Sequence, residues 1–208
     1  MNCQTIHFFR VFSLLAIVLL LLLCPSCAES EDLENSAYVE LMELHAFDQV
    51  VEQFNRDSRF TRVIALMSPG DPLSLRIFKD LKQIFNKIPD EDIRLYIVWV
   101  SVLENDKRKQ ALKLTREFDD SRLVGIWDAQ NIAAKQWQLA LQIDQPAWDV
   151  YLLYDKGHRW VQTAEPPDFW MRQLSGLTDV PFWDRKTFES KLREVIAISK
   201  TNLKADEG

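Results

Sequence analysis

Two runs of apolar and β-branched residues, separated by a helical pattern, restrict this chain to a small group of folds. The runs are FTRVIALM at Phe60–Met67 and IRLYIVWVSV at Ile93–Val102, and each predicts a buried strand. Between them, Leu73–Ile88 repeats apolar residues at helical spacing, with Asp71 as a suitable N-cap and Pro72 as the first helical residue. A strand, a helix and a second strand in this order predict a β-α-β unit with parallel strands and a right-handed crossover.

Patterns in the rest of the chain predict further elements around this unit. Apolar stripes and capping residues predict one helix capped by Asp128, and others at Ala37–Arg56, Asn105–Phe118, Asp168–Leu174 and Lys186–Lys200. Short apolar runs predict strands at Arg122–Trp127 and Val150–Tyr154, the latter in a hairpin with Arg159–Thr163. We therefore expect one α/β domain over residues 37–200, with a central mixed sheet, flanking helices, extra helices at both ends, and a disordered tail at 201–208.

The first 27 residues have the layout of a secretory leader. One basic residue, Arg10, precedes an unbroken apolar run from Leu14 to Leu23, and small residues follow it. The run is shorter than the roughly 20 apolar residues that a membrane-spanning helix needs. We therefore expect export, with a signal peptide at 1–27 followed by an acidic, solvated tether at 28–36.

The cysteines of this leader leave two outcomes open. Cys27, directly after Ser26, resembles the cleavage-and-lipidation box of bacterial lipoproteins, although Cys24 stands where such a box usually has leucine. The resemblance implies a lipid on Cys27, attachment to a membrane, and a place in the cell envelope or periplasm. The alternative is secretion as a soluble protein, in which cleavage removes Cys3, Cys24 and Cys27 together. A redox role for the C-P-S-C pair is disfavoured, because a reactive dithiol needs a folded surrounding that lowers one thiol's pKa.

The body of the chain lacks the residues of several common chemistries. No cysteine follows Cys27, which excludes internal disulfides and thiol chemistry there. His45 and His158 are isolated, so we expect no metal site, and no G-x-S-x-G motif supports a serine hydrolase. The net charge of −6, without a basic cluster that stands out in the sequence, argues against nucleic acid as a partner. We expect no cofactor.

The order β-α-β, helices, β-β-α resembles the thioredoxin fold. In that fold the redox cysteines follow a strand and begin a helix, where helix N–H groups and the helix dipole stabilise a thiolate. The corresponding stretch here is MSPGDPLSLRIF. Asp71 and Ser74 stand where the two sulfur atoms of a C-P-x-C motif would be, and Pro72 remains between them. The resemblance therefore implies the fold without its thiol-disulfide exchange, because that exchange requires a thiolate.

Three stretches resemble a narrower group of uncharacterised exported thioredoxin-like proteins. They are DSRLVGIWD, AWDVYLLYD and PPDFWMRQL, and the resemblance covers Arg62–Leu174. Thioredoxins place a cis-proline directly before the strand that faces the cysteines. In this chain Trp148 and Asp149 occupy that position, and Pro146 comes slightly earlier. The residue that faces Asp71 is therefore left open.

Candidate binding residues fall near the expected helix N-terminus. Asp71 and Ser74 could hold a ligand there, whereas the structural alternative is an N-cap followed by a solvent-facing serine. Trp148 and Trp170, with Phe169, are expected in loop or helix-start positions on the same face. There they would line a shallow groove for a peptide or a small ligand; the structural alternative is core packing.

A second candidate site is a charged set beside Trp127. Asp120, Arg122 and Asp128 lie within nine residues of one another. The functional interpretation is an Arg–carboxylate binding site, and the structural interpretation is an ion pair within the fold.

These observations predict an exported, lipid-anchored protein with a thioredoxin fold that has lost its redox cysteines. We expect it to act as a non-catalytic binding or scaffolding module for an envelope protein or peptide, because no thiol remains for redox work. One alternative is an enzyme that needs no cysteine and uses Asp71, Asp149 and Arg122 as acid–base or ligand groups. Another is a degenerate copy of a former thiol-disulfide oxidoreductase.

Overall fold

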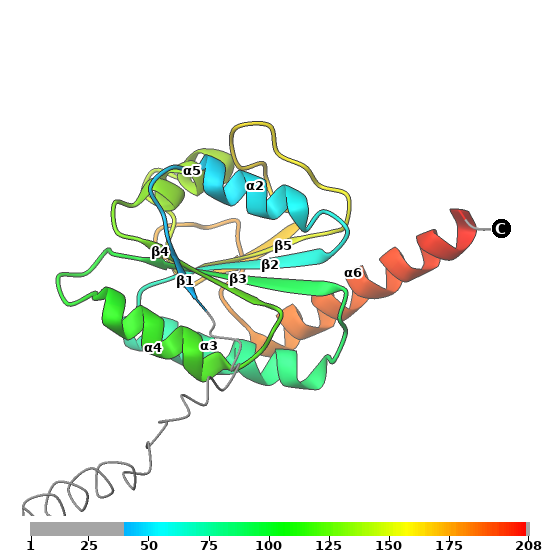
Figure 1. Ribbon diagram of the computed structural model, residues 1–208, viewed down its shortest axis with the longest axis horizontal. Helices are drawn as coiled ribbons and strands as arrows, with labels where there is room; N and C mark the ends of the chain where they lie inside the picture. The colour runs from blue at the N-terminus through cyan, green and yellow to red at the C-terminus, as the bar shows by residue number, and fades with distance from the viewer. Residues whose placement is uncertain (1–39, 207–208) are drawn as a thin grey trace, which may run out of the picture. The chain divides into compact units, whose positions relative to one another are not determined.

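The computed structural model describes residues 40–206, whose strands form one mixed sheet (Figure 1). The strand order is β1-β4-β3-β2-β5-β6. The strands are β1 (Leu41–Glu43), β2 (Thr61–Met67), β3 (Ile93–Val100), β4 (Leu123–Asp128), β5 (Val150–Tyr154) and β6 (Phe169–Arg172). The helices are α2 (Asp48–Arg56), α3 (Pro72–Lys87), α4 (Arg108–Phe118), α5 (Ile132–Ala140) and α6 (Arg185–Asp206). The α/β class and the mixed sheet predicted from the sequence are confirmed.

The β-α-β unit lies at the centre of this sheet. Strands β2 and β3 are parallel, with a register that runs from Thr61 opposite Ile93 to Met67 opposite Trp99, and α3 connects them. Strands β4 and β1 continue the parallel part, whereas β5 and β6 run antiparallel on the other side. Every residue of β2 is buried. This explains the unbroken apolar run, since helices cover a central parallel strand on both faces.

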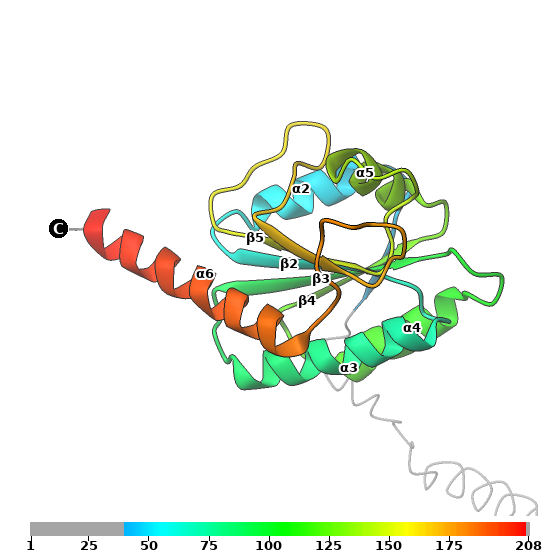
Figure 2. The same cartoon turned by 180° about the vertical axis from the view of Figure 1, so that it is seen from behind.

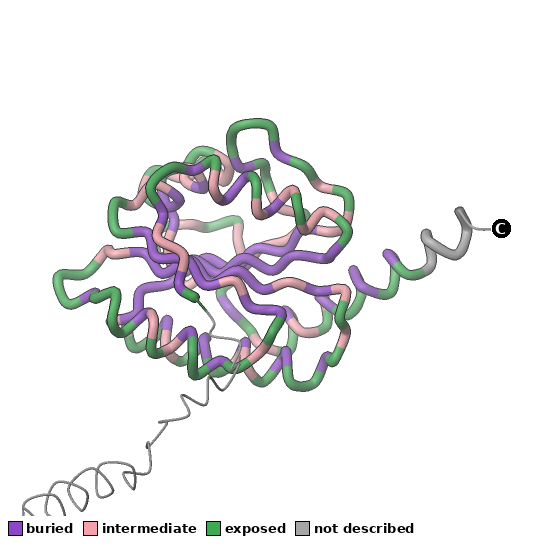
Figure 3. The backbone as a smooth tube through the Cα atoms, in the orientation of Figure 1, coloured by how far each residue is buried: buried purple, intermediate pink, exposed green. Residues whose placement is uncertain are grey.

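Helices form a layer on each face of the sheet. Figures 1 and 2 show α2 and α5 on one face and α3, α4 and α6 on the other. The tube through the sheet between them is almost entirely buried (Figure 3). Because β2, β3 and β4 are parallel, their carboxyl ends meet at one edge of the sheet, next to the N-terminus of α3. This edge is where a site of the thioredoxin type would lie.

An aromatic cluster fills the layer beneath α2. The rings of Phe54 and Trp160 stack with their centroids 3.6 Å apart, and Trp137 and Tyr154 pack edge-on against Trp160. Trp160 belongs to the connection between β5 and β6 and is 2% exposed. The cluster therefore holds this long connection against the domain instead of leaving it in solvent.

The helix predicted at Ala37–Arg56 is wrong in its first part. Leu41–Glu43 form β1, which pairs in parallel with Gly125–Trp127 of β4, and the helix begins only at Asp48. The helical spacing of Leu41 and Leu44 also fits an edge strand, because three residues are too few to separate the two periods. The open edge of β4 decides between them by offering backbone hydrogen bonds.

The helix predicted at Asp168–Leu174 is also wrong. Phe169–Arg172 form β6, and it is this segment, rather than Arg159–Thr163, that pairs with β5. The sequence FWMR is rich in residues that favour strands. The free edge of β5 satisfies the backbone groups of this segment, whereas a helix of only seven residues would leave most of them unpaired.

The last helix extends past Lys200, where the sequence predicted its end, and reaches Asp206. The proposed signal peptide, the lipidation residue Cys27 and the tether at 28–36 lie outside the described residues. Within residues 40–206, no helix combines the length and the apolar content needed to cross a bilayer.

Candidate functional site

The predicted site residues Asp71 and Ser74 lie where β2 gives way to α3, at the carboxyl edge of the parallel strands. Asp71 has extended backbone, and its Oδ2 accepts a hydrogen bond of 2.7 Å from the backbone N–H of Ser74. Pro72 is the first helical residue. The prediction of an N-cap followed by proline is therefore confirmed, and both candidate residues lie on a strand-to-helix junction.

The structural alternative predicted that Ser74 faces solvent, and this prediction is wrong. The residue is completely buried. Its Oγ accepts a hydrogen bond of 3.1 Å from the backbone N–H of Ser68 and donates one to Oδ1 of Asp149. The position of the second sulfur in a thioredoxin motif is thus occupied by a hydroxyl with fixed partners on two other segments.

Asp149, directly before β5, is the residue that faces this helix N-terminus. It is 3% exposed, has a left-handed backbone with φ of 50°, and receives a second hydrogen bond of 3.3 Å from the Tyr151 hydroxyl. Burial, and to a smaller extent the charge of Asp71, raise the pKa of Asp149, and the hydrogen bonds from Ser74 and Tyr151 oppose the rise, so that the pKa is about 6. A carboxyl group therefore stands where thioredoxins have their proline.

Asp106 locks the loop before α3 to the loop after β3. One carboxylate oxygen accepts hydrogen bonds from Ser68 Oγ at 2.7 Å and from the Gly70 N–H at 2.9 Å. The other accepts from the N–H groups of Val102 and Leu103, at 2.9 and 2.7 Å. Asp106 was not among the site residues predicted from the sequence. A local pattern could have indicated it, because aspartate side chains often accept hydrogen bonds from backbone N–H groups three or four residues earlier and so stabilise a turn.

The three aromatic candidates do not form one groove. Trp148 is half-buried and adjoins Asp149 at the site. Phe169 and Trp170 are neighbours on β6, so their side chains point to opposite faces of the sheet. Phe169 packs with the α3–α4–α6 layer, and Trp170 packs with the α2–α5 layer. Of the three, only Trp148 lies next to the N-terminus of α3, because the residue after it, Asp149, binds Ser74.

Arg122 lies at the opposite edge of the sheet from Asp71. Its guanidinium pairs with Asp120 at 2.6 Å and donates hydrogen bonds to the carbonyl oxygens of Phe85 and Ile88, at 2.9 and 2.5 Å, where α3 ends. Asp128 lies at the other end of β4, where its carboxylate accepts the N–H groups of Ile132 and Ala133 and so caps α5. Asp120 and Arg122 therefore lie at one end of β4 and Asp128 at the other, so the three charged residues near Trp127 do not form one site.

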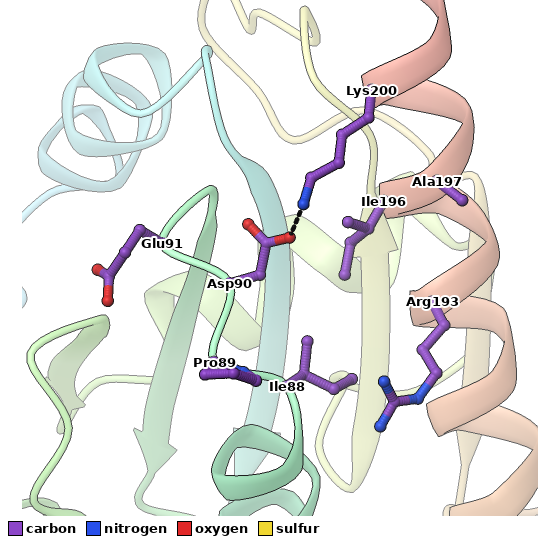
Figure 4. A pocket seen from close by; sticks show the side chains of 8 residues that line it. All are labelled: Ile88, Pro89, Asp90, Glu91, Arg193, Ile196, Ala197 and Lys200. Carbon is purple, nitrogen blue, oxygen red and sulfur yellow. Dashed lines mark hydrogen bonds and ion pairs between the residues drawn. The ribbon is translucent and has the colours of Figure 1, made fainter.

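A separate hollow of about 630 Å³ lies where α6 passes the loop after α3 (Figure 4). Its lining includes Ile88, Arg193 and Ile196, and Lys200 forms an ion pair with Asp90 at its rim. This hollow is at the C-terminal end of α3, whereas Asp71 is at the N-terminal end. Among residues 40–206, no group of three or more His, Cys, Asp or Glu side chains is placed to hold a metal ion.

Asp149→Asn is expected to stabilise the protein at alkaline pH. Because the folded pKa of Asp149 is raised, the contribution of this carboxyl group to stability is fully present below its unfolded pKa of about 4 and is lost as the pH rises through about 6. Asparagine resembles the protonated carboxyl group, and its amide oxygen can accept the hydrogen bond from the Ser74 hydroxyl. It also tolerates the left-handed backbone conformation. We expect a gain of about 2 kcal/mol in the free energy of unfolding at pH 8 and none at pH 4, measured by urea denaturation.

The matched control is Asp144→Asn, an exposed aspartate in the same connecting segment. It should change stability by less than about 0.5 kcal/mol at either pH. A destabilised Asp149→Asn variant at pH 8 would show that the ionised carboxylate is stabilised by its hydrogen bonds.

No protein-family model and no curated protein matches this sequence. Among solved structures, the chain is similar to a thioredoxin-like protein in its oxidised form, with 15% identity over 67% of this chain and 79% of the other, at a TM-score of 0.45. It is also similar to a putative thioredoxin from Neisseria meningitidis, with 14% identity over 71% of this chain and 80% of the other, at a TM-score of 0.42. The order of strands and helices in residues 40–206 and the place of α3 are consistent with the thioredoxin-like fold that the sequence resemblance implied.

Proposed function

We propose that this chain is an exported thioredoxin-fold protein, anchored to the cell envelope by a lipid on Cys27, that binds a protein or peptide without redox chemistry. The observation that supports this proposal is the identity of the residues at the N-terminus of α3. Asp71 and Ser74 hold the positions of a C-x-x-C pair, and the serine hydroxyl is engaged by a buried carboxyl group, that of Asp149. No thiol is available there to pass electrons.

Apolar side chains around this junction support a binding role. Leu73, in the first turn of α3, is 49% exposed, and Leu103, on the loop that Asp106 holds against Gly70, is 36% exposed. Trp148 lies half-buried on the third segment of the junction. Exposed leucine and tryptophan side chains on fixed loops are suited to the apolar residues of a peptide.

The redox part of the proposal is tested by insulin reduction. The purified chain is expected to give no turnover above buffer, because neither Asp71 nor Ser74 can attack a disulfide. The double variant Asp71→Cys/Ser74→Cys, in which the same helix N-terminus carries a dithiol, serves as the positive comparison. Turnover by the unmodified chain would refute the proposal.

The binding part is tested by purifying the chain from envelope fractions under mild cross-linking. Trp148→Ala is expected to lose a co-purifying protein that the unmodified chain retains. The control is Val161→Ala, which removes an apolar side chain that is 85% exposed on the connection between β5 and β6. Equal recovery of the partner with both variants would move the binding surface away from the α3 junction.

One observation favours a second candidate function, a cysteine-independent enzyme. A carboxyl group with a pKa near 6 suits general acid–base catalysis at neutral pH. The partners this alternative requires are not assembled, however, since Arg122 lies at the opposite edge of the sheet, where it closes the end of α3. The binding function therefore remains the proposal that the geometry supports best.

A further inference from the structure

The charges of this acidic chain are distributed unevenly between the two helical layers. Helices α3, α4 and the part of α6 up to Lys200 contain 13 of the chain's 25 Lys and Arg residues but only four of its 31 Asp and Glu residues. The opposite layer, α2 and α5, carries two basic and two acidic residues. The sequence shows no basic cluster because three separate segments supply these charges. Folding places the three helices α3, α4 and α6 on one face of the sheet (Figure 2).

This basic layer is continuous and its charges are accessible. Phe118 of α4 packs against Phe78 of α3 with ring centroids 5.6 Å apart, and α3 in turn packs against α6. Ion pairs leave the lysines largely exposed: Lys113 keeps 77% of its side-chain surface exposed beside Glu117, and Lys87 keeps 55% beside Glu189. The outer surface of the layer therefore presents a positive field to solvent.

The chain enters the described domain next to this layer. Strand β1 follows directly after residue 40, and Arg108 at the start of α4 pairs with Glu43 of β1 at 2.7 Å. Twelve residues separate Cys27 from Glu40. Fully extended, they span at most about 40 Å. A membrane anchor at Cys27 would thus keep the start of the described domain within about 40 Å of the headgroups. Such tethering raises the effective concentration of α4 at the surface, so that even a weak attraction becomes effective.

From this charge separation and this point of entry, we propose that the outer face of α3 and α4 docks on an anionic phospholipid surface. The inference deepens the proposed function, because it rests on the lipid anchor that the proposal includes. Lysine and arginine side chains near anionic headgroups are each attracted to the surface, and the effect falls off within a screening length. Docking by this face fixes how the domain sits on the membrane.

The test labels lysines of the full chain, reconstituted with vesicles, with an amine-reactive reagent and reads each residue by mass spectrometry. Vesicles of phosphatidylcholine are compared with vesicles that also contain phosphatidylglycerol. We expect labelling of Lys79, Lys109 and Lys113 to fall about fivefold in the anionic vesicles, while Lys135 of α5 stays unchanged. Salt at about 1 M should restore the labelling, because it shortens the screening length to about 3 Å.

A pair of matched variants separates docking from anchoring. Lys79→Glu/Lys109→Glu/Lys113→Glu should abolish the protection of Lys87, weakening docking about 100-fold. Arg56→Glu/Lys135→Glu/Arg159→Glu makes the same charge change at exposed positions outside the layer and should preserve it. Circular dichroism checks that both variants fold.

Three outcomes would overturn the docking. Uniform labelling of vesicle-bound chain would overturn it alone and leave the anchor intact, whereas chain in the supernatant of both vesicle kinds would overturn anchor and docking together. Protection of the same lysines by a DNA duplex, and not by phosphatidylglycerol, would assign the basic layer to nucleic acid instead.

Discussion

Asp106→Ala is expected to destabilise the protein by about 4 kcal/mol, the largest single effect among the residues near the site. The carboxylate accepts four hydrogen bonds. Its loss leaves the buried Ser68 hydroxyl without its acceptor and the Gly70 N–H with only the weaker bond of 3.3 Å to Ser68 Oγ. An unpaired buried donor costs about 1–3 kcal/mol, whereas the N–H groups of Val102 and Leu103 can recover part of their loss from water. Urea denaturation of both proteins measures the difference.

Two control variants identify the cause of this loss. Asp106→Asn keeps one acceptor oxygen and should recover about half of the stability. Asn105→Ala, at the exposed neighbouring position, should change stability by less than about 0.5 kcal/mol. If Asp106→Ala were as stable as wild type, the two loops would not depend on this carboxylate. The hypothesis that Asp106 fixes the loops at the site would then be wrong.

Arg122→Leu is expected to cost about 3 kcal/mol of stability while leaving partner binding unchanged. The substitution removes the donor for the last carbonyl groups of α3 and leaves Asp120, whose side chain is only 13% exposed, without its partner. Removing one member of a buried pair typically costs about 3–5 kcal/mol, and we take the lower end because Asp120 can reach water. Thermal or urea denaturation gives the stability, and the cross-linking experiment gives the binding.

The pH dependence of this variant provides an independent check. Burial alone would raise the pKa of Asp120, but hydrogen bonds from Arg122 outweigh it and hold that pKa below its usual value. A depressed folded pKa contributes stability above the unfolded pKa of about 4, and this stability is lost as the pH falls through the folded value. The difference between wild type and Arg122→Leu should therefore shrink in acid. If Arg122→Leu instead lost partner binding at unchanged stability, the result would support the interpretation of Arg122 and Asp120 as a binding site.

The parts of the fold that the sequence predicted are those with strong local signals. Asp71 and Pro72 mark the start of α3, and two buried runs mark β2 and β3. The errors at β1 and β6 have a common cause. Both are short edge segments of three and four residues, whose conformation is decided by a neighbouring strand rather than by their own periodicity.

The candidate site was predictable only in part. The helix N-terminus follows from the sequence, but the bond between Ser74 and Asp149 joins residues 75 positions apart, and no local pattern encodes it. The separation of Arg122 from Asp128 has a simple geometric origin. A strand rises about 3.3 Å per residue, so residues at the two ends of β4 lie on opposite edges of the sheet despite their closeness in sequence.

The antiparallel placement of β5 beside β2 has a consequence for the order in which the molecule matures. A chain synthesised only as far as α5 already contains β1 to β4 and the helix that begins at Pro72, but it lacks the Asp149 carboxyl group. Contacts of such long sequence separation form late, because loop closure must precede them. The bond between Ser74 and Asp149, and with it the finished N-terminus of α3, therefore forms only after β5 in the last third of the chain has been made and has paired with β2.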